Sequence, residues 1–107
     1  MTREQLLPPD ILTQLPGLGE AYNQENPLAV VKFFYPDFSW TWYGIEFDGK
    51  DLFYGLVDGF ELEYGSFLLS ELMKNRGQRG MEIERDFYFT PTPAHDLYWA
   101  LKRKRAA

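Results

Sequence analysis

The chain has 107 residues, of which 45% are hydrophobic, 18% aromatic and 25% charged, and its formal net charge at pH 7 is −5. This length fits one domain with one hydrophobic core, and the high aromatic content excludes a largely disordered chain. The sequence has no cysteine, which excludes disulfides, thiolate metal sites and cysteine nucleophiles. Because it also lacks a long apolar run or an apolar leader, we expect a cytoplasmic protein without a membrane helix.

The distribution of charge limits the kind of partner. Four of the 11 basic residues are consecutive at 102–105, so seven basic residues stand against 16 acidic ones elsewhere. Such an acidic body repels nucleic-acid phosphates unless its few basic residues cluster. A broad nucleic-acid surface is therefore disfavoured, whereas a partner with a basic surface is allowed.

The first half of the chain predicts a turn-rich segment followed by an antiparallel meander. Asp10 is expected to cap a short helix that runs to about Gln14. Runs of β-branched and aromatic residues then alternate with turn signals at Asp48-Gly49 and Asp58-Gly59. The predicted strands are 29–35, 39–47, 52–57 and 60–67.

The second half predicts a short helix at 69–74, a flexible stretch at 75–80 and a fifth strand at 81–89. A terminal helix is expected from Thr92, as a capping hydroxyl, to about residue 105. The apolar stripe of this helix is Ala94, Leu97, Tyr98 and Leu101.

These elements indicate a single α+β domain over 1–107. It would consist of a turn-rich segment at 1–28, a sheet core of about five antiparallel strands with an inserted helix at 29–89, and a C-terminal helix at 92–105 with a basic end.

A band of aromatic residues occupies the predicted meander. Strand alternation places Trp40 and Trp42 on one side and Tyr43, Ile45 and Phe47 on the other. Most of these rings should fill the core, but exposed rings can also stack nucleic-acid bases. Residues that could form such a single-stranded nucleic-acid or nucleotide site are Lys32, Trp40, Trp42, Arg76 and Arg79.

Seven acidic residues also gather in this region of the sequence, and several of them lie in turns or on one strand face. We expect them to concentrate at one edge of the sheet. They could mimic the phosphates of DNA and bind a basic protein, or they could form an ordinary solubilising face. The residues of this predicted acidic patch are Asp37, Glu46, Asp48, Asp51, Asp58, Glu61 and Glu63.

Arg85 falls on the apolar side of the predicted fifth strand. An unpaired buried charge is costly, so a buried structural ion pair is expected, with Glu63 or Asp58 as partner. The alternative is an anion-binding arginine in a pocket.

No arrangement predicts catalysis. His95 is the only histidine, and no motif nominates a nucleophile beside it. The acids show no metal-ligand spacing of the EF-hand kind. We therefore expect no catalytic residues, no metal site and no cofactor.

Several short motifs together resemble the bacterial domain-of-unknown-function family two-nine-five-eight. The motifs are Val31-Lys32-Phe33-Phe34 with Pro36, Trp40-Thr41-Trp42-Tyr43, Phe53 to Gly59, Leu69-Ser70-Glu71-Leu72, Arg76-Gly77, and Ile83-Glu84-Arg85-Asp86 with Tyr88-Phe89 and Pro91-Thr92-Pro93. The resemblance covers about residues 12–93. Leu68 departs from it, because the family usually has a serine there that forms a capping box with Glu71.

The resemblance implies a small stand-alone protein carried on plasmids, phages or integrative elements, often near antirestriction or conjugation genes. It implies no known activity. Together with the charge pattern, it favours a non-enzymatic accessory protein that binds a host or element protein through a basic surface of that partner. The alternative is the nucleic-acid or nucleotide module described above.

Overall fold

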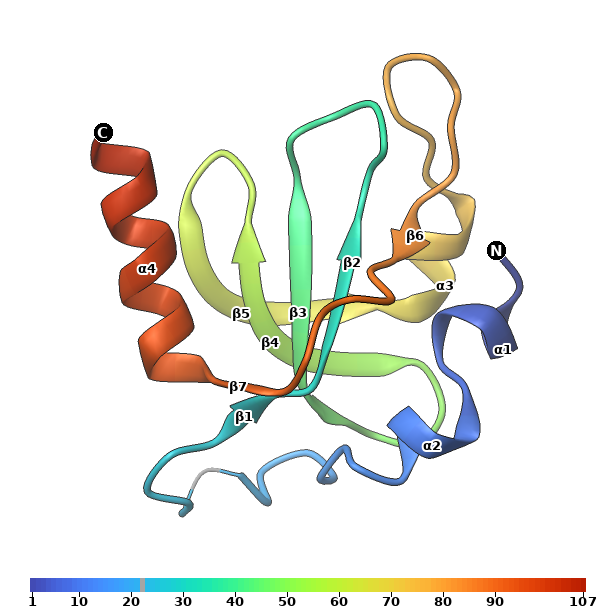
Figure 1. Cartoon of the computed structure of the whole chain (residues 1–107). Helices are drawn as coiled ribbons and strands as arrows, with labels where there is room; N and C mark the ends of the chain where they lie inside the picture. The colour runs from blue at the N-terminus through green and yellow to red at the C-terminus, as the bar shows by residue number, and fades with distance from the viewer. Residues whose placement is uncertain (22) are drawn as a thin grey trace.

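A computed structural model of the chain describes residues 1–21 and 23–107. Its centre is a five-stranded antiparallel sheet in the order β5-β4-β3-β2-β6 (Figure 1). The fold class predicted from the sequence is confirmed. The strands are β2 (Val31–Phe34), β3 (Thr41–Phe47), β4 (Leu52–Asp58), β5 (Leu62–Leu68) and β6 (Glu84–Arg85).

The predicted meander corresponds to β3, β4 and β5, with ends shifted by one or two residues. The turn between β3 and β4 is held by Asp48, whose Oδ1 accepts hydrogen bonds from the backbone N–H groups of Lys50, Asp51 and Leu52 at 2.8–3.0 Å. Gly49 takes φ +87° in this turn, a conformation that favours glycine. The hairpin predicted from Asp48-Gly49 therefore forms through the hydrogen bonds of the aspartate and the positive φ of the glycine.

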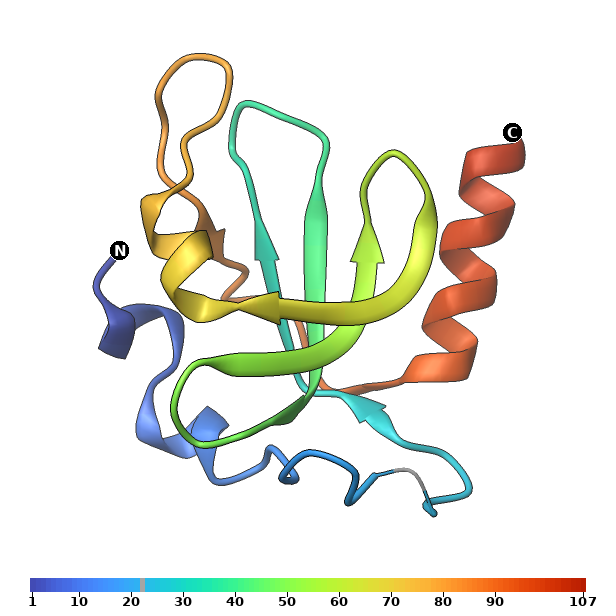
Figure 2. The same cartoon turned by 180° about the vertical axis from the view of Figure 1, so that it is seen from behind.

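Strands β4 and β5 bend sharply together, so the sheet curls (Figures 1 and 2). Three glycines lie side by side at this bend, since Gly44 pairs with Gly55 and Gly55 with Gly65. A Cβ atom at Gly55 would lie 1.8 Å from the carbonyl oxygen of Tyr43. The close approach of β3 and β4 at this point thus requires glycine.

The predicted strand at 29–35 is divided between two sheets. β1 (Leu28–Ala29) pairs with β7 (Thr92–Pro93), whereas β2 pairs with β3 and β6. Between them, the N–H of Val30 donates to the carbonyl oxygen of Gly44 at 2.8 Å. The sequence is continuously strand-like here, but the partners change from one residue to the next.

The N-terminal segment contains two short helices, α1 (Arg3–Leu6) and α2 (Pro9–Leu12). Helix α2 begins earlier than predicted. Asp10 lies inside its first turn and does not cap it. The first helix was missed. It begins with a capping box in which Thr2 and Gln5 each accept a backbone N–H of the other.

Helix α3 (Leu69–Lys74) has the predicted bounds. The side chain of Leu68 cannot accept a hydrogen bond, so the helix is capped by a residue from elsewhere in the chain. The carboxylate of Asp51 accepts hydrogen bonds from the backbone N–H of Ser70 at 2.7 Å and from the Ser70 hydroxyl at 2.6 Å. This contact compensates for the missing serine at position 68.

The predicted strand at 81–89 is wrong over most of its length. Only Glu84 and Arg85 join the sheet. Immediately after them, the carboxylate of Asp86 accepts the N–H of Tyr88 at 2.9 Å, and the N–H of Phe89 bonds to the Asp86 carbonyl. This local turn replaces the strand ladder.

The terminal helix α4 (Ala94–Ala106) begins two residues later than predicted. The Thr92 hydroxyl donates to the Thr90 carbonyl at 2.8 Å and does not cap the helix, because Thr92 belongs to β7. The predicted apolar stripe of α4 packs on the sheet as expected. No helix in the described part of the chain has the length and apolarity needed to cross a membrane.

Each face of the sheet has its own hydrophobic cluster. The face covered by α1 and α3, called the α3 face, buries Phe33, Trp42, Phe47, Phe53 and Leu69 among others. The face covered by α4, called the α4 face, buries Tyr43, Ile45, Leu56 and Ala94. The terminal helix thus stands alone against one side of the sheet (Figure 1).

A bulge in β3 corrects one prediction about these faces. The register shifts between Gly44 and Glu46, so Phe47 shares the α3 face with Trp42. Strict alternation had placed it opposite, with Tyr43 and Ile45. The extra residue puts Ile45 and Glu46 together on the α4 face, where both line a cavity.

Candidate functional site

The predicted acidic patch is dispersed over both ends and both faces of the sheet. Asp48 and Asp51 lie at the β3–β4 turn, where their carboxylates hold that turn and the start of α3. Asp37 and Asp58 lie at the other end of the strands. Glu46 is 6% exposed and accepts the N–H of Ala21.

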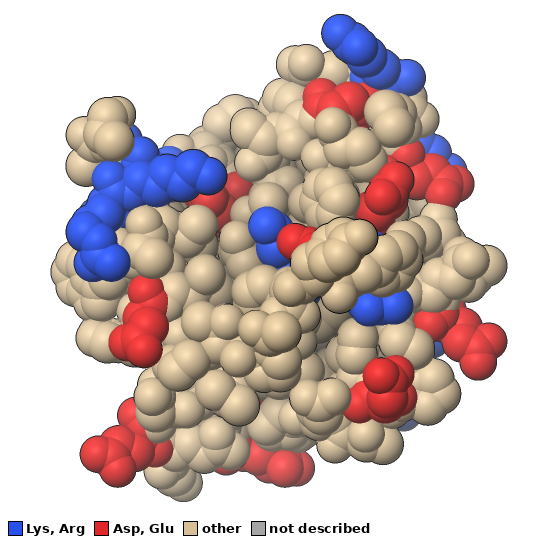
Figure 3. All heavy atoms as spheres, in the orientation of Figure 1, with Lys and Arg blue, Asp and Glu red and all other residues tan. Residues whose placement is uncertain are grey.

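The partners of the acids at the second end are also intramolecular. Asp37 accepts the N–H of Arg79 at 2.7 Å, and Asp58 forms an ion pair with Arg105 at 2.7 Å. Of the seven acids, only Glu61 and Glu63 make no side-chain hydrogen bond or ion pair within the described residues. Figure 3 shows the same scatter on one face, with basic side chains gathered at the C-terminal end of α4.

Arg85 corrects a second prediction. Its Nε donates to the carbonyl of Gln5 at 2.9 Å, and its guanidinium lies 4.6 Å from the ring centroid of Phe87. No carboxylate pairs with it among the described residues, and Asp58 is engaged by Arg105. Because Arg85 lies on the short edge strand β6 and is only partly buried, a carbonyl and a ring face are sufficient partners.

The five residues of the predicted nucleic-acid site do not come together. Lys32 lies on the α4 face, where its Nζ is 5.9 Å from the Tyr43 ring centroid and 3.5 Å from Asp86. The guanidinium of Arg76 is engaged within the fold, because it donates hydrogen bonds to three backbone carbonyls at the end of α3. Arg79 is exposed in the loop beyond. Trp40 and Trp42 alone remain adjacent, on the α3 face.

The two tryptophans line a small groove on the α3 face, which we call the tryptophan groove. Its volume is about 270 Å³. Their ring centroids are 5.9 Å apart, and Trp40 also contacts the exposed ring of Phe60 at 5.2 Å. The lining residues are Trp40, Trp42, Val57, Glu63, Gly65, Ser66, Phe67, Glu71, Leu72 and Asn75.

The electrostatics of the tryptophan groove are one-sided. Its charged lining residues are Glu63 and Glu71, both exposed, and within residues 1–21 and 23–107 no lysine or arginine lines it. Carboxylates beside indole faces attract cations and repel phosphates. The groove thus combines two residues from the predicted nucleic-acid site with one from the predicted acidic patch.

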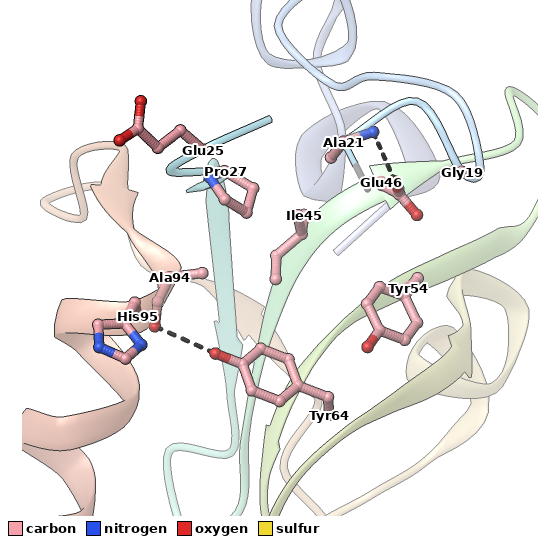
Figure 4. Close-up of a pocket in the computed structure, with 10 residues that line it drawn as sticks. All are labelled: Gly19, Ala21, Glu25, Pro27, Ile45, Glu46, Tyr54, Tyr64, Ala94 and His95. Atoms are coloured by element: carbon pink, nitrogen blue, oxygen red, sulfur yellow. Dashed lines mark hydrogen bonds between the residues drawn. The ribbon is translucent and has the colours of Figure 1, made fainter. Parts of the chain in front are cut away.

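A larger cavity of about 750 Å³ opens on the α4 face, and we call it the tyrosine pocket (Figure 4). It lies between Gly19, Ala21, Glu25 and Pro27 of the N-terminal segment, strands β3 to β5 and the first turn of α4. Tyr54 and Tyr64 stack at 6.4 Å, and the Tyr64 hydroxyl donates to the Ala94 carbonyl at 3.5 Å. Burial raises the pKa of Tyr64, so this phenol stays neutral.

Sequence reasoning missed most of the tyrosine pocket. It singled out Glu46, but as a member of a surface patch, and it assigned no role to His95 at the rim. The available signal was that Tyr54 and Tyr64 share one strand face across the β4–β5 hairpin. No group of three or more histidine, aspartate or glutamate side chains within residues 1–21 and 23–107 is placed to hold a metal ion.

Comparison with known proteins gives one match. A family model described as "Protein of unknown function (DUF2958)" matches residues 6–106. No curated protein and no solved structure matches the chain.

Proposed function

The chain belongs to the DUF2958 family of proteins of unknown function, and from this starting point we propose that it works without catalysis, by binding a partner protein that has a basic surface. The motif resemblance further supports a cytoplasmic accessory role on a plasmid, phage or integrative element, of the antirestriction or anti-defence kind. The partner would then be a host or element protein.

The observation that carries the proposal is the tryptophan groove. Its volume of about 270 Å³ suits one long cationic side chain of the partner. The aliphatic part of a lysine or arginine would lie against Trp40 and Trp42, and its charged end would meet Glu63 and Glu71. A cation over an indole face contributes roughly 0.5–2 kcal/mol, depending on how far it is desolvated.

The exposed ring of Phe60, 85% accessible beside the groove, extends the contact surface. Aromatic residues of this kind are typical anchors in protein interfaces. The net charge of −5 would steer a basic partner towards the molecule from a distance. A DNA-mimic surface built from all seven predicted acids has less support, because five of them bind groups of the chain itself.

The direct test is a fluorescence titration in a Trp99→Phe background, which restricts the emission to Trp40 and Trp42. The probe is a capped peptide that alternates lysine, arginine and glycine. We expect it to shift the emission, with an affinity that falls as salt rises. The combined change Glu63→Gln and Glu71→Gln should weaken binding about tenfold, since two exposed charge pairs at up to about 1 kcal/mol each together contribute about 1–2 kcal/mol.

A matched control removes the same charge elsewhere, with Glu4→Gln and Glu20→Gln on exposed residues outside the groove. It should retain most of the affinity. Equal weakening in both variants would show that only net charge matters and would reject the groove. Tighter binding of a short oligonucleotide to the Glu63/Glu71 variant would instead support base stacking on Trp40.

The absence of catalysis is tested separately. Screens for phosphodiesterase, esterase and nucleotidase activity, with and without divalent ions, should stay at background. Turnover that survives repurification and disappears in His95→Ala would contradict a purely binding role.

A further inference from the structure

We propose that the tyrosine pocket binds a small organic cation: an ammonium or amidinium group carried on an apolar body. This site is separate from the proposed function, because it lies on the α4 face, across the sheet from the tryptophan groove. The two sites share no lining residue.

The shape of the pocket suits a small molecule. At about 750 Å³ it lies within the usual range for ligand sites, and its walls come from five separate parts of the chain. Ile45, Pro27, Ala21 and Ala94 form apolar walls, and Figure 4 shows the Tyr54 and Tyr64 rings facing the same space. An apolar body is thus needed to fill it.

The charge of the pocket sets the sign of the ligand. Among the described residues, Glu46 and Glu25 line it together with His95, and no lysine or arginine does. Glu46 is 6% exposed, and its one hydrogen bond among the described residues is from the N–H of Ala21 to Oε2, at 2.8 Å. A carboxylate can accept about four hydrogen bonds, so Glu46 has capacity for further donors.

The structural task of Glu46 does not require a charge. Accepting the Ala21 N–H fixes Ala21 against β3, and the amide oxygen of a glutamine would do the same. The negative charge therefore has no counterpart inside the described fold. An ammonium or amidinium group entering from the cavity would supply both the opposite charge and the missing donors.

The tyrosine rings add a second attraction for a cation. Tyr54 and Tyr64 are nearly parallel at 12°, and Tyr64 in turn stacks on Tyr98 at 5.6 Å and 13°. Of these three rings, Tyr54 and Tyr64 line the pocket. Ring faces attract cations through their quadrupole, more strongly where water is excluded.

The experiment compares three probes of similar size and different charge: 2-phenylethylamine, 2-phenylethanol and phenylacetate. Binding is followed from the amide signals of Ala21 and Ala94 in two-dimensional NMR spectra of the full chain. We expect the amine to bind at least tenfold more tightly than the alcohol, and phenylacetate to bind least. Glu46→Gln should remove the advantage of the amine while leaving the weak binding of the alcohol unchanged.

Two further variants keep the test decisive. Glu61→Gln removes an equal charge outside the pocket and should leave amine binding unchanged. Tyr54→Leu replaces a ring that is 38% exposed, which the fold should tolerate, and should weaken the amine at least threefold even if Glu46→Gln fails to fold. The proposal is overturned if none of the probes moves these signals, if phenylacetate binds as well as the amine, or if folded Glu46→Gln retains the preference.

Discussion

The three glycines at the bend of the sheet allow the packing argument to be tested with one substitution made at three places. A Cβ atom added at Gly55 would lie 1.8 Å from the Tyr43 carbonyl oxygen, which is backbone and cannot move without separating β3 from β4. At Gly44 the nearest atoms are carbons of the buried side chains of Phe53 and Val31 at 2.9 Å, so side chains rather than backbone would have to move. A Cβ atom added at Gly65 would have no described atom within 4 Å beyond its chain neighbours.

Overpacking of a core costs about 1–3 kcal/mol, and a clash with backbone belongs at or above the upper end of this range. We therefore expect Gly55→Ala to lower the free energy of unfolding by about 3 kcal/mol or more. Gly44→Ala should cost about 1–2 kcal/mol. Gly65→Ala should lie within about 0.5 kcal/mol of the parent or be slightly more stable, since alanine restricts the unfolded chain.

The assay is urea denaturation followed by circular dichroism, with thermal unfolding as a second measure. A loss of about 3 kcal/mol should lower the Tm by more than about 10 °C in a domain of this size. The reasoning is refuted if Gly55→Ala and Gly65→Ala have the same stability. It is also refuted if Gly44→Ala is the more damaging of the two buried changes.

Three other changes test the contacts of carboxylates and arginine. Asp51→Ala removes both hydrogen bonds to Ser70 and should cost about 1–2 kcal/mol in urea denaturation, whereas no loss would reject this cap. Backbone hydrogen bonds lower the pKa of Asp48 below its ordinary 3.8, so its stabilisation is present above that pH and is lost as the pH falls through the folded pKa. The Tm difference between the parent and Asp48→Asn should therefore shrink on acidification below about pH 4, and a constant difference would contradict this. Arg105→Ala breaks an ion pair with Asp58 that is about a third exposed, and should cost less than about 1 kcal/mol, which thermal unfolding at low and high salt would check.

The parts of the fold that could be predicted are those with local signals. The Asp48 carboxylate binds backbone N–H groups of its own turn, so this turn is specified locally. The helix at 69–74 follows from its apolar spacing. The division at Val30 and the late start of α4 depend on β1 pairing with β7, which no local pattern encodes. The prediction of a strand at 81–89 was wrong because the hydrogen-bonded turn at Asp86 competes with pairing to the neighbouring strand.

The candidate sites were harder to predict for a related reason. Placing Trp40 and Trp42 on one face needs only strand alternation, and this was correct. Carboxylates close in sequence look like a patch, but Asp48 and Asp51 are taken up by backbone donors that are visible only in the folded chain. The bulge that turns Glu46 into the tyrosine pocket has no sequence signature at all.

The pairing of β1 with β7 has a consequence for the order of folding. The meander forms from neighbours in sequence, whereas this pairing joins residues 28–29 to residues 92–93 and carries a larger loop-closure entropy. The pairing of β1 with β7 is also short, and a hydrogen bond from the Ala94 N–H to the Pro27 carbonyl at 2.8 Å extends it. The junction should therefore close last and open first, releasing α4 in a subglobal unfolding event. Because Pro27 and Ala94 line the tyrosine pocket, the pocket exists only while that junction is closed. Amide hydrogen exchange at Ala94 thus reports the lifetime of the site.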